Sequence, residues 1–207
     1  MEPQSTFSPV FPSFRNLMQG EMQQHNLSAQ RVLIVPGLHG SEHAHWQSRW
    51  QRLYPSFERV DQDDPHTPNL DVWCDRFQEV LRRSTQPTIA VAHSFGCLAT
   101  VRAAAQGAPN LIGMLLVAPA DPEKFGLADM MQTGPLTQPA LLVGSRNDPW
   151  MASERARIWA EIWGADFLCA GELGHINAES GIGDWPFGLS LLLKLIEGAR
   201  IQYAKIV

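Results

Sequence analysis

The sequence is poor in cysteine, and its cysteines are not spaced for cross-links or a structural metal. Only Cys74, Cys97 and Cys169 occur in 207 residues. They are odd in number, lie far apart and form no CxxC pair, so neither a disulfide framework nor a zinc ribbon is expected. Reduced thiols and a cytoplasmic location fit this pattern.

Basic residues and long apolar runs are also lacking. Lys and Arg number 16 against 21 Asp and Glu, for a formal net charge of −5. Since no basic face is expected, neither nucleic acid nor an anionic membrane surface is predicted as a partner. The apolar run at 189–196 contains Ser190 and Lys194 and is far shorter than the roughly 20 residues that cross a bilayer.

The first part of the chain lacks a structural period. Residues 1–29 are rich in Gln, Ser, Pro and Met and show neither strand nor helix periodicity. No basic segment leads into an apolar one, so a signal peptide is not expected. We predict an N-terminal extension over 1–29, outside the core, and one domain over 30–207.

From residue 31 onward, short apolar runs alternate with segments of helical spacing. This alternation predicts an α/β fold, a mostly parallel sheet with helices on both faces. Strands are expected at 32–35, 57–60, 88–92, 114–117, 140–143 and 166–169. Helices are expected at 43–53, 70–83, 95–106, 153–163 and 185–198.

A candidate nucleophile follows the third of these strands. Ser94 lies between Ala92 and Gly96, directly after the apolar run and at the start of a helix. A nucleophile elbow needs this strand–turn–helix context, with small residues two positions before and after the serine. Ala92 keeps the small size but departs from the usual glycine. On this motif alone, a buried strand-to-helix turn is the competing interpretation.

Two further residues supply what a serine nucleophile requires. A serine hydroxyl needs a neutral imidazole to take its proton and a carboxylate to orient that imidazole. Asp148 follows the strand at 140–143, and His175 lies in a glycine-containing loop after the strand at 166–169. The order Ser, Asp, His is that of α/β-hydrolases. We therefore predict Ser94 as nucleophile, Asp148 as the orienting acid and His175 as the base.

An oxyanion hole completes such a site, because each preorganised donor contributes about 3 kcal/mol to catalysis. One backbone N–H is expected from Phe95, immediately after the nucleophile. The other is expected from the loop after the first strand, where Gly37 and Gly40 permit close approach to a ligand and we select Leu38. An ordinary Pro-Gly turn is the alternative there.

Three histidines near this loop suggest a metal site as a competing hypothesis. His39, His43 and His45 and the carboxylate of Glu42 fall within seven residues. His43 and His45 are two apart at an expected helix start and so point to different sides, and no second ligand cluster is evident. We expect no metal, and substrate-loop or surface histidines instead. Cys97, three residues after Ser94, is expected to be a small buried hydrophobe.

One connection is unusually long. Residues 121–138 join two expected strands and contain several Pro and Gly together with Phe125, Met130 and Met131. Such a segment is a candidate lid over a pocket. A plain surface connection is the other interpretation, and the sequence leaves both open.

Several motifs resemble those of the small bacterial serine hydrolases related to retinoblastoma-binding protein 9 and the YdeN-type proteins. They are Val35-Pro36-Gly37-x-x-Gly40-Ser41, His45-Trp46-Gln47, Gln62-Asp63-Asp64, Ala92-His93-Ser94-Phe95-Gly96-Cys97, Ser145-x-Asn147-Asp148-Pro149 and Gly174-His175-Ile176-Asn177. The resemblance implies a compact α/β-hydrolase with a minimal cap and a triad at Ser94, Asp148 and His175. The extension before residue 31 departs from the typical compact member.

These observations together predict hydrolysis of a small or medium acyl ester through an acyl-enzyme on Ser94. That chemistry requires no cofactor. Two alternatives stay open: an amidase or peptidase that uses the same triad, and a hydrolase fold that binds a protein partner without turnover. The intact set of three residues argues against the second, and no feature of the sequence indicates a protein partner.

Overall fold

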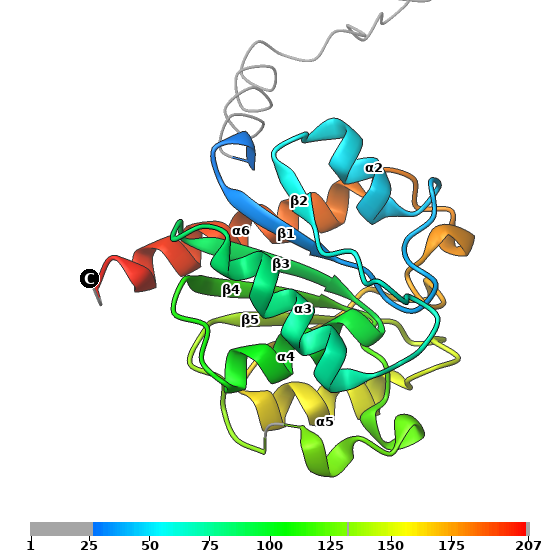
Figure 1. Cartoon of the computed structure of the whole chain (residues 1–207). Coiled ribbons are helices and arrows are strands. Elements are labelled where there is room, and N and C mark those ends of the chain that lie inside the picture. The colour runs from blue at the N-terminus through cyan, green and yellow to red at the C-terminus, as the bar shows by residue number, and fades with distance from the viewer. Residues whose placement is uncertain (1–26, 132, 206–207) are drawn as a thin grey trace, which may run out of the picture.

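A six-stranded parallel sheet forms the centre of the computed structural model, which describes residues 27–131 and 133–205 (Figure 1). Its strand order is β2-β1-β3-β4-β5-β6, and every neighbouring pair is parallel. The strands are β1 (Arg31–Val35), β2 (Phe57–Arg59), β3 (Thr88–His93), β4 (Leu111–Val117), β5 (Ala140–Gly144) and β6 (Asp166–Cys169). All six expected strands are present, and the predicted α/β class is confirmed.

Helices cover both faces of the sheet. They are α2 (Trp46–Leu53), α3 (Leu70–Arg82), α4 (Phe95–Ala105), α5 (Ser153–Trp163) and α6 (Pro186–Tyr203). Side chains alternate along the central strands, so Leu33 and Val35 of β1 belong to the apolar layer that includes α3, α4 and α5, whereas Val32 and Ile34 belong to the layer that includes α2 and α6. The sheet therefore separates two apolar layers, as expected for a parallel sheet buried on both faces.

The helix boundaries differ from the prediction by more than one residue at two places. The first helix begins at Trp46 rather than at 43, because the buried His45 is its N-cap and accepts the backbone N–H of Gln47 on Nδ1 at 3.2 Å. The last helix continues past Gly198 to Tyr203. A single exposed glycine lowers helix stability without ending the helix when apolar neighbours hold it on the sheet.

The predicted extension over 1–29 falls mostly outside the described residues. Leu27, within its last three positions, is only 1% exposed and packs in the apolar layer beneath α2 and α6. The core thus already includes Leu27. The remainder of the proposed division into an extension and a domain stays a prediction.

The long connection 121–138 contains two short 3₁₀ helices, Pro122–Phe125 and Ala128–Met130, in its described part. The ring of Phe125 lies 5.2 Å from that of Phe95, centroid to centroid, and lines the cavity beside Ser94. The segment therefore contributes a wall to the cavity. Its movement as a lid stays a prediction.

Candidate active site

The three residues predicted to act together lie at the carboxyl edge of the sheet, on the loops that follow β3, β5 and β6. His175 Nε2 is 3.0 Å from Ser94 Oγ, and His175 Nδ1 is 3.0 Å from Asp148 Oδ2 and 3.1 Å from Oδ1. Positions 94, 148 and 175 are far apart in sequence. They meet because parallel strands end at one edge of the sheet, where doubly wound folds place their sites.

Ser94 occupies a strained turn between β3 and α4. Its backbone φ of 53° and ψ of −124° lie in a region that residues with a side chain rarely adopt. This conformation projects the hydroxyl above the end of the strand, as in a nucleophile elbow. The turn also requires Gly96, since a Cβ there would lie 2.4 Å from Pro36 O and 2.6 Å from Val35 O.

This contact yields a stability prediction with a matched control. Gly96→Ala forces a methyl group against two backbone carbonyls and should lower the free energy of unfolding by about 3 kcal/mol. Gly198→Ala, on the exposed side of α6 with nothing within 4 Å of its added Cβ, should raise it by about 1 kcal/mol. Urea unfolding of both variants measures the difference. An unaltered midpoint for Gly96→Ala would show that the elbow does not pack as described.

The hydrogen bonds define the protonation of His175. Asp148 is acceptor-only as a carboxylate, so the imidazole proton is on Nδ1, and the Nε2 lone pair is free to accept from the Ser94 hydroxyl. The Asp148 side chain is 2% exposed, and its Oδ1 also accepts the backbone N–H of Trp150 at 2.8 Å. That second bond fixes the carboxylate plane against the ring.

Two buried side chains hold the loop of His175 from the opposite side. His93 Nε2 donates to the carbonyl of His175 at 2.9 Å, and Trp46 Nε1 donates to the carbonyl of Ile176 at 2.8 Å. Ile176 is fully buried with φ of +46°, a conformation that is costly for a β-branched residue. The two bonds offset this cost, and His93, which directly precedes Ser94, links the loop of His175 to the end of β3.

The same loop is tied to the end of β5. The backbone N–H of Leu173 donates to Ser145 Oγ at 2.9 Å, and that of Gly174 donates to Asn147 Oδ1 at 2.7 Å. Sequence reasoning assigned no role to Ser145, Asn147 or His93. The partners of such long-range hydrogen bonds cannot be inferred from spacing in the sequence. The only indication that these three residues matter was that they belong to the motifs on which the family resemblance rests.

Both residues predicted to supply oxyanion donors lie near Ser94. Leu38 lines the cavity, and Phe95 follows the nucleophile at the first position of α4, where a backbone N–H has no partner within its own helix. The loop of Leu38 approaches the elbow closely, since a Cβ on Gly37 would lie 2.6 Å from Ser94 Cβ. This explains the glycine at position 37. The roles of the two N–H groups stay predictions.

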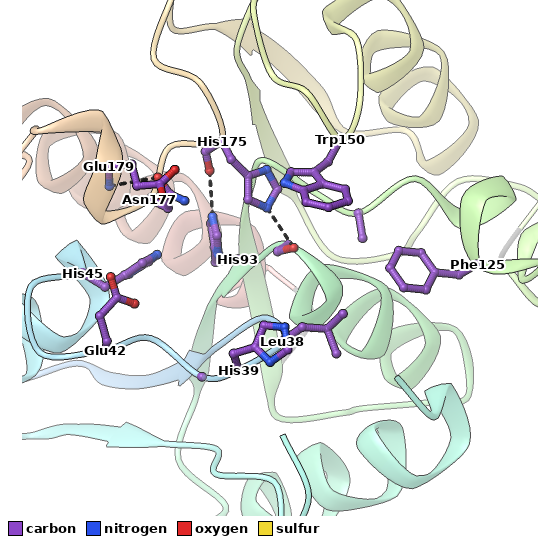
Figure 2. Close-up of a pocket in the computed structure, with 13 residues that line it drawn as sticks. Leu38, His39, Glu42, His45, His93, Phe125, Trp150, His175, Asn177 and Glu179 are labelled. Carbon is purple, nitrogen blue, oxygen red and sulfur yellow. Dashed lines mark hydrogen bonds between the residues drawn. The ribbon is translucent and has the colours of Figure 1, made fainter. Parts of the chain in front are cut away.

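A cavity of about 340 Å³ opens beside these side chains (Figure 2). Such a volume is at the lower end of the range for small-molecule pockets. Its lining comes from the loops after β1, β3, β4, β5 and β6. The residues are Leu38, His39, Gly40, Glu42, His45, His93, Ser94, Ala120, Phe125, Trp150, His175, Asn177 and Glu179.

The three histidines weighed as metal ligands lie in different environments. His43 is exposed, His39 Nδ1 is 2.9 Å from Nδ1 of His66, and His45 is buried beside His93 with ring centroids 4.7 Å apart. No group of three or more potential ligands gathers within the described residues. Burial, followed by the charge of Arg59, lowers the pKa of His45 to about 3, so this ring is neutral at physiological pH.

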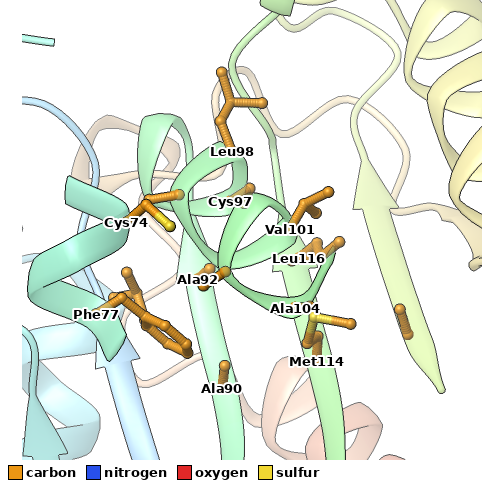
Figure 3. Packing of buried hydrophobic residues seen from close by; sticks show 14 of the residues in the cluster. Cys74, Phe77, Ala90, Ala92, Cys97, Leu98, Val101, Ala104, Met114 and Leu116 are labelled. Carbon is orange, nitrogen blue, oxygen red and sulfur yellow. The ribbon is translucent and has the colours of Figure 1, made fainter. Parts of the chain in front are cut away.

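Cys97 packs as the sequence predicts. It is fully buried among apolar side chains between α4 and the sheet, close to Ala92, Leu98 and Val101 (Figure 3). Burial raises the pKa of its thiol far above the ordinary value. A protonated, inaccessible thiol is not a nucleophile, so Cys97 does not compete with Ser94.

Comparison with known proteins decides the family. A family model described as serine hydrolase matches residues 32–194. The chain belongs to the serine hydrolase family. Within the described part of this serine hydrolase, no helix combines the length and apolar character needed to cross a membrane.

Two solved structures make the relationship more specific. The serine hydrolase is similar to a protein from Pectobacterium atrosepticum described as a YdeN-like hydrolase, with 39% identity over 87% of this chain and 98% of the other and a TM-score of 0.84. The YdeN protein of Bacillus subtilis shares 21% identity over 82% of this chain and 100% of its own, with a TM-score of 0.68, a likeness of fold. Comparison with curated proteins gives no match.

Proposed function

We propose that this serine hydrolase cleaves carboxylic esters of small or medium acyl groups through an acyl-enzyme on Ser94. The observation that carries the proposal is the pair of 3.0 Å contacts that His175 makes, with Ser94 Oγ through Nε2 and with Asp148 Oδ2 through Nδ1. Both contacts are within the reach that general-base catalysis requires.

The chemistry proceeds in two halves. Ser94 Oγ attacks the ester carbonyl carbon while His175 Nε2 takes the hydroxyl proton, and Asp148 stabilises the resulting imidazolium. The tetrahedral oxyanion accepts hydrogen bonds from the N–H groups of Leu38 and Phe95. Collapse breaks the bond to the alcohol oxygen, which receives the proton from His175. Water, deprotonated by His175, then attacks the acyl-enzyme; the acid is released as the bond to Ser94 Oγ breaks, and His175 returns its proton to that oxygen.

The cavity volume supports a limit on acyl length. A space of about 340 Å³ holds a short chain and a small leaving group, whereas a long lipid chain would have to extend into solvent. We expect kcat/KM for p-nitrophenyl esters to be highest between acetate and octanoate and to fall about tenfold or more at palmitate. A rate that rises steadily to palmitate would contradict the size assignment.

A matched amide distinguishes the ester proposal from its alternative. The p-nitroanilide of the best acyl group has the same size but a leaving group that His175 must protonate more fully. We expect its kcat/KM to be lower by a factor on the order of 10³. Comparable rates for the ester and the anilide would instead identify an amidase or peptidase.

A further inference from the structure

A buried hydrogen-bond donor without a partner lines the cavity beside Ser94. His45 Nδ1 accepts the backbone N–H of Gln47, and burial keeps the ring neutral by lowering its pKa to about 3. A neutral imidazole that accepts on one nitrogen carries its proton on the other, so Nε2 is an N–H donor. His45 is 2% exposed, and its Nε2 has no hydrogen-bond acceptor among the described residues. The ring thus brings an unsatisfied donor to the cavity wall.

Ring contacts and the helix cap hold His45 in this orientation. Its ring centroid is 4.7 Å from that of His93 and 5.3 Å from that of Trp46. Figure 2 shows the ring reaching from the loop before α2 toward His93 and the middle of the cavity. Because Nδ1 is bound to the start of α2, Nε2 is directed away from that bond. Buried donors nearly always have an acceptor, so this one indicates an acceptor that a ligand supplies.

A second donor without a protein partner lies on the same side of the cavity. Asn177 Oδ1 accepts the backbone N–H of Glu179 at 3.1 Å, which fixes the orientation of the side-chain amide. The NH₂ group of that amide donates no hydrogen bond to the described residues. Figure 2 shows Asn177 and His45 together on the side of His175 that is opposite Phe125. Two neutral N–H donors thus line one part of the cavity.

The charges around these donors favour a neutral acceptor over an anion. Neither Lys nor Arg is among the described residues that line the cavity, whereas the exposed Glu42 and Glu179 are. A carboxylate or phosphate ligand would therefore lie near two like charges without a compensating cation. An ether, carbonyl or hydroxyl oxygen accepts a hydrogen bond without that repulsion.

The opposite side of the cavity favours an apolar group. Phe125 packs there against Phe95, with ring centroids 5.2 Å apart. Trp150 is 57% exposed, and its ring centroid is 6.3 Å from that of His175. These rings supply faces that an apolar portion of a substrate can cover. In Figure 2 the hydrogen bond between His175 and Ser94 lies between the two sides, so a substrate at Ser94 reaches both.

We propose that His45 is a specificity-determining residue, whose Nε2–H binds a neutral oxygen acceptor of the substrate together with the Asn177 amide. The acceptor is an ether, carbonyl or hydroxyl oxygen on one side of the scissile ester bond, and the group on the other side is apolar. This assignment rests on the proposed ester hydrolysis and adds a substrate class to it.

Isosteric esters test for this acceptor, because an ether oxygen in place of a methylene adds an acceptor and nearly retains the shape. On the acyl side, p-nitrophenyl 3-ethoxypropanoate and 4-methoxybutanoate are compared with the hexanoate. On the alcohol side, 2-methoxyethyl and 3-methoxypropyl butyrate are compared with butyl and pentyl butyrate. After correction for hydrolysis by hydroxide, we expect kcat/KM for at least one ether to exceed that of its carbon analogue about tenfold.

Two substitutions at position 45 connect the preference to Nε2. Asparagine places its side-chain oxygen near the position of Nδ1, where it can cap α2, and has no donor at the position of Nε2. His45→Asn should therefore lower the ether-to-carbon ratio of kcat/KM about tenfold. Glutamine is longer and brings an NH₂ group to the position of Nε2, so His45→Gln should retain most of the preference. The ratio cancels any general effect of a substitution on turnover.

A control variant and a charged ester complete the test. His43→Asn changes an exposed histidine outside the cavity lining and should keep the wild-type ratio. p-Nitrophenyl hydrogen adipate carries a carboxylate at the end of its chain, and its enzymatic kcat/KM should be lower than that of the 4-methoxybutanoate. A higher value for the adipate would overturn the neutral acceptor.

The outcomes separate the two proposals. Hydrolysis of the carbon esters without an ether preference on either side would overturn the role of His45 and leave ester hydrolysis standing. An ether preference that persists in His45→Asn would also overturn it, because another residue would then bind the oxygen. Failure to hydrolyse any ester would overturn the proposed function itself.

Discussion

Ser94→Ala is expected to lower kcat for p-nitrophenyl butyrate by a factor on the order of 10⁶, because the attacking oxygen is removed and the other two residues have no independent nucleophile to activate. Alanine keeps the Cβ that the elbow already accommodates at φ of 53°, and among the described residues the Ser94 hydroxyl forms a hydrogen bond with His175 alone. The midpoint of thermal unfolding should therefore stay close to that of the wild type.

Rate and stability must be measured on the same preparation. A loss of activity with an unchanged unfolding midpoint would support Ser94 as the nucleophile. Retention of a wild-type rate by a correctly folded Ser94→Ala variant would refute the assignment of Ser94 as the nucleophile. Loss of the folded state would show instead that the hydroxyl stabilises the elbow.

Asp148→Asn should reduce kcat by about 10⁴ through the wrong tautomer of His175. The hydrogen bond from Trp150 N–H to Asp148 Oδ1 predicts the orientation of the new amide. Its oxygen will keep that bond, so its NH₂ group will face His175 Nδ1. The imidazole must then carry its proton on Nε2. A protonated Nε2 has no lone pair with which to accept the proton of Ser94.

Asp121→Asn is the matched control for this substitution. Asp121 is a buried carboxylate on the loop after the neighbouring strand β4, and it pairs with Arg155 at 2.7 Å rather than with His175. Its replacement should leave kcat within a few-fold of the wild type. A small effect of Asp148→Asn together with a large effect of Asp121→Asn would place the acid at the end of β4.

The order of elements and the meeting of Ser94, Asp148 and His175 in space could be predicted from sequence because both depend on local patterns. Apolar runs mark the strands, and Ser94, Asp148 and His175 each follow one of them. A parallel sheet then brings such positions to one edge without further information. The observed contacts among these three residues agree with that reasoning.

The supporting contacts could not be predicted, since they depend on partners far away in the chain. His93 and Trp46 hold the carbonyls of His175 and Ile176 across 82 and 130 positions of sequence. His45 stood in a histidine-rich stretch that suggested a metal, whereas burial decides its neutral state. The burial of Leu27 also depends on the three-dimensional position of the helices above it.

The most direct test of the central claim is the mass of the intact protein after treatment with a fluorophosphonate, for wild type beside Ser94→Ala. We expect one adduct per wild-type chain, located at Ser94 by peptide mapping, and none on the variant. An unlabelled but folded wild type, or an adduct that persists in Ser94→Ala, would contradict it.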